Sequence, residues 1–375
     1  MPSLLDKIKP MSIGQERFLN ALKDSRNEIV GAFGPTGTGK SLISCIYGIS
    51  SVLAGTYKRF IITRPVVDVG TSKSLTPEEL GDLYYKIASA YLEDILEGLM
   101  DREEITRLLQ EGKVMVTDVS YLRGGRTFDD SLIFLDDAQN TQPENAAEIL
   151  MRIGRNSRLI IAGDPVLQKP LGAEKDGATL LREVLLNEEN AVVVDLGLKD
   201  IVRPGAKRGV KVSFELRMRK RELSNMERQM LDLVRVHAPD ADVVTVIEFK
   251  QEKENLGIKS ESVPDALIIA KEGHLGRVVG KGGERIKAIE GESNLRVRTV
   301  EMNLNFKEWI RALHPIGWIG KHIVDVDFAG PELMIIVRKS AFGAFVGQRG
   351  IYARLIDRVF KRLINVGIRA MENEE

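Results

Sequence analysis

Six short segments in the first two-thirds of the chain are apolar at nearly every position. They are rich in Val, Ile and Leu and lack the alternation of apolar and polar side chains that marks a strand with one face in water. This pattern predicts strands that are buried on both faces of a sheet. The predicted strands are residues 28–33, 59–63, 114–119, 131–135, 158–162 and 191–196.

Helix-like segments separate these strands. Regular alternation of strands and helices favours a parallel sheet with helices on both of its faces. The fold class expected for this part of the chain is therefore α/β. The predicted helices are residues 41–54, 77–99, 143–153 and 177–186.

A basic run at residues 217–221, followed by a helical pattern over residues 222–237, is expected to close the first domain. Residues 238–242, Ala-Pro-Asp-Ala-Asp, have the composition of a turn or linker, and the sequence predicts a domain boundary there. Three domains are expected in all, at residues 1–239, 240–301 and 302–375.

Two units of similar design follow this boundary. Each has two strands, a short helix, a Gly-x-x-Gly loop, a longer helix and a last strand. One such loop is a weak signal in a chain with 34 glycines. Two copies in tandem, in the same surroundings, predict a repeated small α+β fold. The loops are Gly280-Lys281-Gly282-Gly283 and Gly347-Gln348-Arg349-Gly350.

Charge is distributed unevenly along the chain. The 375 residues contain 54 Lys and Arg against 54 Asp and Glu, so the formal net charge is zero. Residues 203–228 nevertheless hold nine basic side chains against three acidic ones, and residues 338–370 hold eight against one. A polyanion such as RNA is therefore expected to bind mainly to the C-terminal half.

The remaining composition limits the class of protein. The single cysteine, Cys45, leaves no partner for an internal disulfide, and with only four histidines a zinc site is not expected. The longest weakly polar stretch, residues 42–55, is too short and too rich in Ser and Gly to cross a bilayer, and the first ten residues lack an apolar signal core. A cytoplasmic protein without membrane contact is expected.

A phosphate-binding sequence lies between the first predicted strand and the helix that follows it. It fits the pattern G-x-x-x-x-G-K-[ST], and its strand–loop–helix context is the one that phosphate binding needs. Backbone N–H groups and the positive end of the helix would hold the phosphates. Lys40 would reach the β- and γ-phosphates, and the Ser41 hydroxyl would bind Mg²⁺. The candidate nucleotide ligands are Gly34, Pro35, Thr36, Gly37, Thr38, Gly39, Lys40 and Ser41.

Two further strand ends carry polar side chains. Asp136 and Asp137 follow the strand 131–135, where Mg²⁺ needs a carboxylate, so Asp136 is expected in the metal shell and Asp137 to orient or deprotonate the attacking water. Gln168 follows the strand 158–162 and is expected at the same edge, near the γ-phosphate. The guanine-reading sequence N-K-x-D does not occur, which favours ATP over GTP.

With these loops in place, the chain resembles the PhoH family of P-loop ATPases over roughly residues 5–222. The resemblance implies a RecA-like ATPase core, similar to that of superfamily one helicases, and an association with RNA. The family usually has Asp-Glu where this chain has Asp136-Asp137, so the proposed base has a shorter stem. The ordered strings that carry the resemblance are Gly14-Gln15, Gly34–Ser41, Arg64–Val67, Tyr121–Thr127, Leu135–Asn140, Arg158–Gln168 and Asp200–Arg203.

The resemblance also implies roles for individual residues. Gln15 looks like the adenine-reading glutamine, and Gln168 looks like the helicase-type sensor of the γ-phosphate. Arg203 looks like an arginine that acts on the transition-state charge, within its own subunit or in a neighbour; a solvated member of the basic run is the equal alternative. Because one chain has no obvious second RecA-like half, family resemblance implies a homo-oligomer such as a ring of six subunits.

The two Gly-x-x-Gly units resemble KH domains of the type II arrangement. In that fold the loop clamps the backbone of about four nucleotides, so glycines permit close approach and a basic residue helps. Lys281 and Arg349 match that requirement. The implied partner is single-stranded or structured RNA.

Two functions are compatible with these motifs. The first is an ATP hydrolase that couples turnover to remodelling, unwinding or movement of RNA. The second is a nucleotide-gated RNA-binding adaptor, associated with ribosomes or nucleases, in which hydrolysis only times release. A small-molecule kinase fits less well, because the paired aspartates and the two RNA-type units suit water attack and polyanion binding better.

Overall fold

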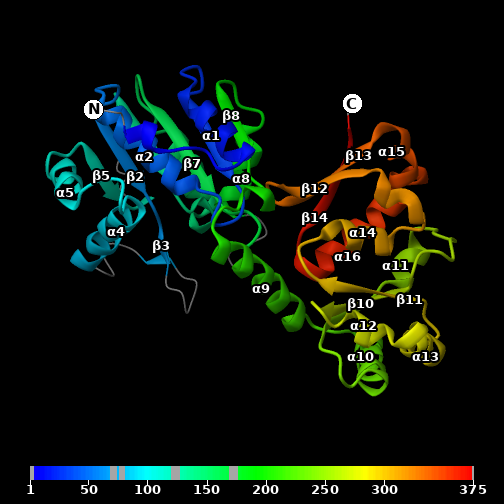
Figure 1. Ribbon diagram of the computed structural model, residues 1–375. Helices are drawn as coiled ribbons and strands as arrows, with labels where there is room; N and C mark the ends of the chain where they lie inside the picture. The colour runs from blue at the N-terminus through cyan, green and yellow to red at the C-terminus, as the bar shows by residue number, and fades with distance from the viewer. Residues whose placement is uncertain (1–3, 68–73, 76–80, 120–126, 169–175, 374–375) are drawn as a thin grey trace. The chain divides into compact units, whose positions relative to one another are not determined.

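The computed structural model describes residues 4–67, 74–75, 81–119, 127–168 and 176–373. The chain divides into two compact units, residues 1–207 with 328–331 and residues 208–327 with 332–375. Figure 1 shows the elements of both units. Across the described ranges, no helix is long and apolar enough to cross a membrane.

A six-stranded sheet forms the centre of the first unit. Its order is β5-β2-β6-β7-β1-β8, and all neighbouring strands are parallel. Each strand lies within two residues of its predicted range, so the predicted α/β fold is confirmed. The strands are β1 (Ile29–Phe33), β2 (Arg59–Thr63), β5 (Val114–Thr117), β6 (Ser131–Leu135), β7 (Arg158–Gly163) and β8 (Ala191–Asp195), and a separate antiparallel pair is β3 (Val66–Val67) with β4 (Ser74–Leu75).

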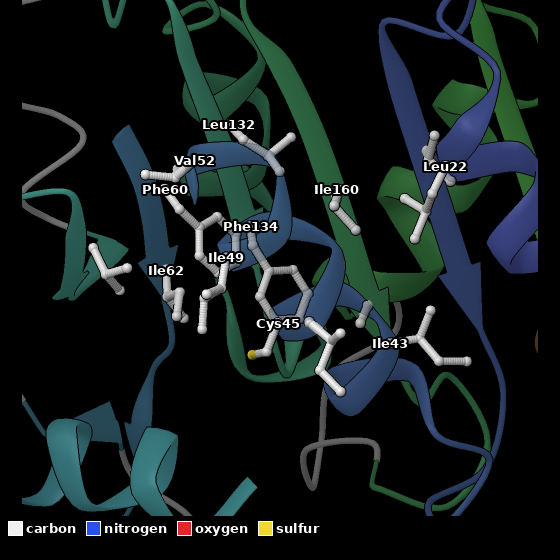
Figure 2. Packing of buried hydrophobic residues seen from close by; sticks show 14 of the residues in the cluster. Leu22, Ile43, Cys45, Ile49, Val52, Phe60, Ile62, Leu132, Phe134 and Ile160 are labelled. Atoms are coloured by element: carbon white, nitrogen blue, oxygen red, sulfur yellow. The ribbon is translucent and has the colours of Figure 1, made fainter. Parts of the chain in front are cut away.

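Helices cover both faces of this sheet. The helices α1, α2, α4 and α5 pack on one face, where Val30, Phe60 and Phe134 point, and α7 and α8 pack on the other, where Ile61 and Ile133 point. Figure 2 shows Cys45 and Ile49 of α2 packed against Phe134 on the first face. The bounds are η1 (Leu4–Lys7), α1 (Ile13–Lys23), α2 (Lys40–Leu53), α4 (Asp82–Ile95), α5 (Arg102–Gln110), η2 (Ala138–Asn140), α7 (Pro143–Leu150), α8 (Gly177–Leu185) and η3 (Leu198–Asp200). Helix α9 (Pro204–Lys220) begins in the first unit and continues into the second.

The second unit contains two KH-like repeats with the same order of elements. Each repeat runs helix, strand, strand, helix, helix, strand, with one additional short helix, α11, between the first two strands of the first repeat. Each forms a three-stranded sheet in which the second and last strands are parallel. The first repeat comprises α10 (Asn225–His237), β9 (Val243–Glu248), α11 (Lys250–Asn255), β10 (Ala266–Lys271), α12 (Leu275–Val279), η4 (Lys281–Gly283), α13 (Glu284–Ser293) and β11 (Val297–Met302). The second comprises α14 (Phe306–Leu313), η5 (Gly317–Lys321), β12 (Ile323–Ala329), β13 (Glu332–Arg338), α15 (Lys339–Val346), η6 (Gln348–Gly350), α16 (Ile351–Ile364) and β14 (Gly367–Asn373).

Helix α10 groups with the second unit, which differs from the boundary expected at residues 238–242. Its Met230 and Val234 are buried in one cluster with Val246 of β9 and Ile268 of β10. The apolar side of α10 therefore serves as the first helix of the first repeat. Sequence patterning showed the helix but not the sheet that it covers.

An arginine ties the two repeats together. Arg362 of α16 donates to the carbonyl oxygen of Glu248 and pairs with the carboxylates of Glu227 and Glu252 in the first repeat. Glu227 is 1% exposed and also accepts from Arg221, so its buried charge has two cationic partners. A buried carboxylate needs such partners, and Arg362 supplies one of them from the other repeat of the same compact unit.

Candidate functional site

The candidate residues of the first unit come from loops at the carboxyl ends of adjacent strands. In the sheet, β1 lies beside β7, β7 beside β6 and β6 beside β2. Because all four run in one direction, the loops that follow them meet at one edge of the sheet. These loops supply residues 34–41 after β1, Asp164 and Gln168 after β7, Asp136 and Asp137 after β6, and Arg64 after β2.

The phosphate-binding loop folds around the ammonium group of Lys40. Lys40 Nζ donates to the carbonyl oxygens of Gly34 and Pro35, both at 2.8 Å, and to Thr38 Oγ1 at 3.2 Å. The lysine begins α2, and the loop before it brings these oxygens to the start of the helix. Phosphate oxygens at this position would compete for the same protons, as a phosphate-binding lysine requires.

Burial and charge act on Lys40 in opposite directions. Its side chain is almost fully buried, which lowers the pKa of the ammonium group, while the nearby carboxylates of Asp164, Asp136 and Asp137 favour the charged form. Burial raises the pKa of Asp164 in turn, and Lys40 opposes that change. The lysine therefore lies in a cluster of carboxylates that compensates its charge.

Ser41 and Asp136 offer a pair of oxygens to a metal ion. Ser41 Oγ donates to Asp136 Oδ1 at 2.9 Å, and the hydroxyl of Tyr91 donates to Asp136 Oδ2. Mg²⁺ prefers oxygen ligands and is usually bound through one or two carboxylates plus substrate phosphates. The donor set fits that requirement. Within the described ranges, no cluster of three or more His, Cys, Asp or Glu side chains could hold a metal without the phosphates.

A chain of side chains joins three of the loops. Arg64 pairs with Asp137, with its Nη2 2.7 Å from Oδ2, and Gln139 Nε2 donates to Asp137 Oδ1 at 3.1 Å. Gln139 Nε2 also donates to Gln168 Oε1 at 2.7 Å, and Gln139 Oε1 accepts from the backbone N–H of Asp164 at 2.9 Å. The two residues that the sequence assigned to water activation and phosphate sensing are thus connected through Gln139.

The N-terminal glutamine contacts the phosphate-binding loop. Gln15 Nε2 donates to the carbonyl oxygen of Thr38 at 3.0 Å, and its Oε1 accepts from the N–H of Met11 at 2.8 Å. The neighbouring Gly14 donates to the carboxylate of Asp200 at 3.0 Å, and a Cβ at Gly14 would lie 2.5 Å from that carboxylate. Glycine is therefore required beside Gln15. Adenine reading by Gln15 stays a prediction.

The segment that carries Arg203 packs on the other side of the loop. Gly37 has a φ of 82°, in the left-handed region that glycine enters freely, and a Cβ there would lie 2.3 Å from Ala206 Cβ. The carbonyl oxygen of Gly37 accepts from the N–H of Val202 at 3.1 Å. Arg203 itself is exposed and lines the cleft, and among the described side chains no ion pair is found for it.

A cleft of about 580 Å³ lies where these loops meet. Of the predicted site residues, Gln15, Gly34, Pro35 and Thr38 lie outside its lining, where they support the loop. The predicted residues that line it are Thr36, Gly37, Gly39, Lys40, Ser41, Asp136, Asp137, Gln168 and Arg203.

Four further residues belong to this site that sequence reasoning did not assign. Arg64, Tyr91 and Asp164 line the cleft, and Gln139 connects its parts. Position along the chain gave a signal for both Arg64, which directly follows a predicted strand, and Asp164, which comes two residues after another. Tyr91 lies in the middle of a helix and carries no such signal. Residues 121–126 of the Tyr121–Thr127 string lie outside the described residues.

The two Gly-x-x-Gly loops have the same backbone conformation. In each, the first, third and fourth residues have positive φ, namely 76°, 64° and 81° in the first loop and 76°, 55° and 77° in the second. A Cβ at Gly280 would lie 2.7 Å from Arg285 Cγ, and one at Gly347 would lie 2.5 Å from the Tyr352 ring, so both first glycines are required. Lys281 and Arg349 are exposed at the loop tips.

The raised pKa of Asp136 predicts how the unfolding free energy of the first unit depends on pH. Burial, reinforced by the charge of Asp137, raises the pKa of Asp136 from 3.8 to about 6. A carboxyl group whose pKa is raised by folding stabilises the folded chain at low pH, and that contribution is lost as pH rises through about 6. In EDTA, lowering the pH from 7 to 5 should therefore add about 1 kcal/mol to the free energy of unfolding of the first unit.

The measurement is denaturant unfolding at both pH values, with Asp136→Asn as the reference. The variant lacks the titrating group and should show a smaller gain, so the difference between the two proteins isolates Asp136 from Asp164. Equal gains in both proteins would contradict the assignment.

Comparison with known proteins agrees with this geometry. A family model described as PhoH-like protein matches residues 7–215, and a KH-domain model matches residues 242–312. The chain is 34% identical over 200 residues to a PhoH-like protein of Bacillus subtilis (strain 168), which covers 52% of this chain and 60% of that relative. It is 32% identical over 199 residues to a PhoH-like protein of Mycobacterium leprae (strain TN), which covers 52% of this chain and 55% of the relative.

The chain therefore spans somewhat more than half the length of these curated relatives. Among solved structures, the large terminase from the thermophilic bacteriophage D6E is similar at 13% identity and a TM-score of 0.35, over 56% of this chain and 51% of that one. This similarity is too low to bear on function.

Proposed function

Since the chain belongs to the PhoH-like protein family, we propose that it is an RNA-binding ATPase that couples ATP hydrolysis to remodelling, unwinding or movement of RNA. The observation that supports this most is the meeting of Lys40, Ser41, Asp136 and Gln168 in one cleft, in a chain that also carries two exposed Gly-x-x-Gly loops. Coupling between the two functions is part of the proposal.

In this proposal each cleft residue has a role that its contacts permit. Lys40 binds the β- and γ-phosphates, and Ser41 and Asp136 hold Mg²⁺. Bound there, Mg²⁺ would neutralise charge that develops on the phosphates. Asp137 orients the attacking water, and Gln168 reports the γ-phosphate to Asp137 through Gln139.

The second unit is proposed to bind single-stranded RNA through both loops. Backbone N–H groups of the loops and the cations of Lys281 and Arg349 would contact phosphates. Arg349 adopts a positive φ that a non-glycine residue rarely takes, a form of backbone strain that is commonly retained at functional positions.

Assembly into a homo-oligomer, such as a six-membered ring, is part of the same proposal. Arg203 is exposed and lines the cleft, a position compatible with a role toward its own nucleotide or toward one held by a neighbour. In a ring, adjacent subunits would supply the second lobe that one chain lacks.

One observation favours the alternative, a nucleotide-gated RNA-binding adaptor. Both carboxylate oxygens of Asp137 already accept hydrogen bonds, one from Arg64 and one from Gln139. Hydrogen bonds to a carboxylate stabilise its charged form and weaken it as a base, which is consistent with slow turnover. The two functions differ in whether RNA accelerates hydrolysis.

The test is steady-state ATP hydrolysis with and without single-stranded RNA. We expect RNA to raise turnover of the wild-type protein, and Lys281→Ala with Arg349→Ala to lose that rise, because the loops no longer hold the RNA backbone. RNA affinity of the double variant should fall about tenfold or more, because two cations that contact phosphates are lost. The salt dependence of RNA binding should decrease for the same reason.

A matched control is Arg235→Ala with Lys259→Ala. It removes the same two kinds of charge from exposed positions outside the loops and should keep the RNA response. If RNA binds but never changes turnover, the adaptor function replaces the motor. If the control loses the response equally, net charge rather than the loops carries RNA binding.

A further inference from the structure

Tyr91 lies between the metal-binding carboxylate and the cleft arginine. Its hydroxyl donates to Asp136 Oδ2, and the guanidinium carbon of Arg64 lies 4.1 Å from the centre of its ring. The same residue lines the cleft. One side chain therefore contacts both Asp136 and the partner of Asp137.

The fold holds Tyr91 firmly in this place. The next residue, Leu92, and Leu96 one turn further are buried in the cluster that also contains Cys45 of α2. A tyrosine hydroxyl ordinarily ionises only at about pH 10, so the group is a hydrogen-bond donor to Asp136 at neutral pH. Helix α4 is thus fixed against α2, the helix that begins with Lys40 and Ser41.

The two carboxylate oxygens of Asp136 have different partners. Tyr91 engages Oδ2, while Oδ1 faces Ser41 Oγ at 2.9 Å. A carboxylate that ligates a metal needs such a partner on its other oxygen, because rotation about its Cβ–Cγ bond would otherwise misdirect the ligand oxygen. The hydroxyl of Tyr91 supplies that partner.

The ring of Tyr91 has a second effect. A guanidinium over an aromatic face is held by attraction to the ring electrons as well as by its ion pair, and Arg64 has both contacts. A planar cation stacks in this way better than an ammonium. The ring therefore sets the position from which Arg64 binds Asp137.

We propose that Tyr91 is a positioning residue of the proposed hydrolysis reaction, whose hydroxyl orients Asp136 for Mg²⁺ and whose ring orients Arg64 toward Asp137. The inference rests on the proposed function and assigns separate effects to the two parts of one side chain. Loss of the hydroxyl should weaken metal binding, and loss of the ring should in addition lower turnover at saturating metal.

The first test uses Tyr91→Phe, which keeps the ring and removes the hydroxyl. Binding of a ribose-labelled fluorescent ATP analogue is titrated with Mg²⁺ and repeated in EDTA. We expect the Mg²⁺ concentration for half-maximal enhancement to rise about 10–100-fold. Affinity for the analogue in EDTA should stay unchanged.

The matched control is Tyr47→Phe. Tyr47 lies on α2, and its hydroxyl accepts from Arg158 at 2.8 Å, outside the cleft lining. This control should keep the wild-type Mg²⁺ dependence. An unchanged Mg²⁺ dependence in Tyr91→Phe would overturn the role of the hydroxyl.

The second test compares Tyr91→Leu and Arg64→Lys at saturating Mg²⁺. Both variants remove the stacked contact between Arg64 and the ring of Tyr91. Arg64→Lys leaves the Tyr91 hydroxyl in place, so Arg64→Lys should lower kcat without shifting the Mg²⁺ dependence. Wild-type kcat in Arg64→Lys would overturn the role of the ring, whether or not the Tyr91 variants fold.

The wild-type titration separates this inference from the function beneath it. If wild-type protein does not bind the labelled nucleotide at any Mg²⁺ concentration, the proposed function and the role of Tyr91 are both overturned. If wild-type protein shows Mg²⁺-dependent binding and Tyr91→Phe matches it, only the role of Tyr91 is overturned.

Discussion

Replacing Lys40 with alanine is expected to lower ATP turnover by about 10²–10³-fold, the loss seen when one charge-stabilising donor is removed from an active site. Lys40 lies among the carboxylates of Asp136, Asp137 and Asp164 and also donates to the carbonyl oxygens of the loop. Without it, the negative charge of the phosphates would face these carboxylates with less compensation. The measurement is steady-state phosphate release at saturating ATP and Mg²⁺.

Lys58→Ala is the matched control for this variant. It also removes one lysine from the first unit, but Lys58 pairs with Asp130 at an exposed position outside the cleft lining. It should retain wild-type turnover. If Lys40→Ala also keeps wild-type turnover, the proposal that this chain hydrolyses ATP is contradicted.

The second large effect is expected at the opposite edge of the sheet. Arg158, at the start of β7, is 8% exposed and donates to the carbonyl oxygens of Leu22, Asp24 and Asn27 and to the hydroxyl of Tyr47. Arg158→Met should lower the free energy of unfolding of the first unit by about 3–5 kcal/mol, because several acceptors lose their donor together.

The expected loss of unfolding free energy is large because the acceptors remain in place when the arginine is replaced. When a buried ion pair is replaced by apolar side chains, both partners disappear and the cost can be small. Three of the partners of Arg158 are backbone carbonyls at the end of α1 and in the turn after it, so they stay in place. Arg158→Lys should recover only part of the loss, since an ammonium lacks the planar fork that reaches separate acceptors.

Denaturant unfolding, followed by circular dichroism, checks this prediction. Arg26→Ala serves as the control, because Arg26 pairs with Asp24 but its side chain is 87% exposed. That variant should unfold at the wild-type denaturant concentration. An unchanged midpoint for Arg158→Met would contradict the view that this arginine holds α1 to the sheet.

The strands of the first unit could be predicted because their environment is uniform. A strand such as Ser131–Leu135 is buried at every position, so its sequence is apolar throughout, and the neighbouring helices follow from alternation. Helix α1 was not predicted, although Phe18, Leu19 and Leu22 form its apolar side. This short apolar side lies beside charged residues, so in sequence the segment resembles an exposed surface segment. Its burial depends on the sheet against which it packs.

The structure brings together those predicted site residues whose positions depend on local sequence. Lys40 and Ser41 belong to one loop, and Asp136 and Gln168 each follow a strand, so parallel strands suffice to bring them together. Tyr91 contacts Asp136 across 45 residues of chain, and no local pattern specifies that approach. Contacts of this kind depend on the packing of α4 against α2.

The same limit applies to the second unit. Two Gly-x-x-Gly loops were visible as repeated strings, and their shared backbone conformation follows from the required glycines. The first helix of the first repeat, α10, was assigned to the preceding domain, because it comes before its strands and carries no repeated motif. Helix α14 falls inside the range predicted for the second repeat, but no helix was predicted there.

The contact between Arg362 and Glu227 bears on how tightly the proposed RNA partner can be held. Because Arg362 of α16 pairs with Glu227 of the first repeat, both loops belong to one compact unit. A strand bound at one loop would present its remaining nucleotides to the other at high effective concentration. The overall affinity for such a strand would then exceed the affinity of either loop alone. A strand that dissociates from one loop is still bound at the other and rebinds quickly.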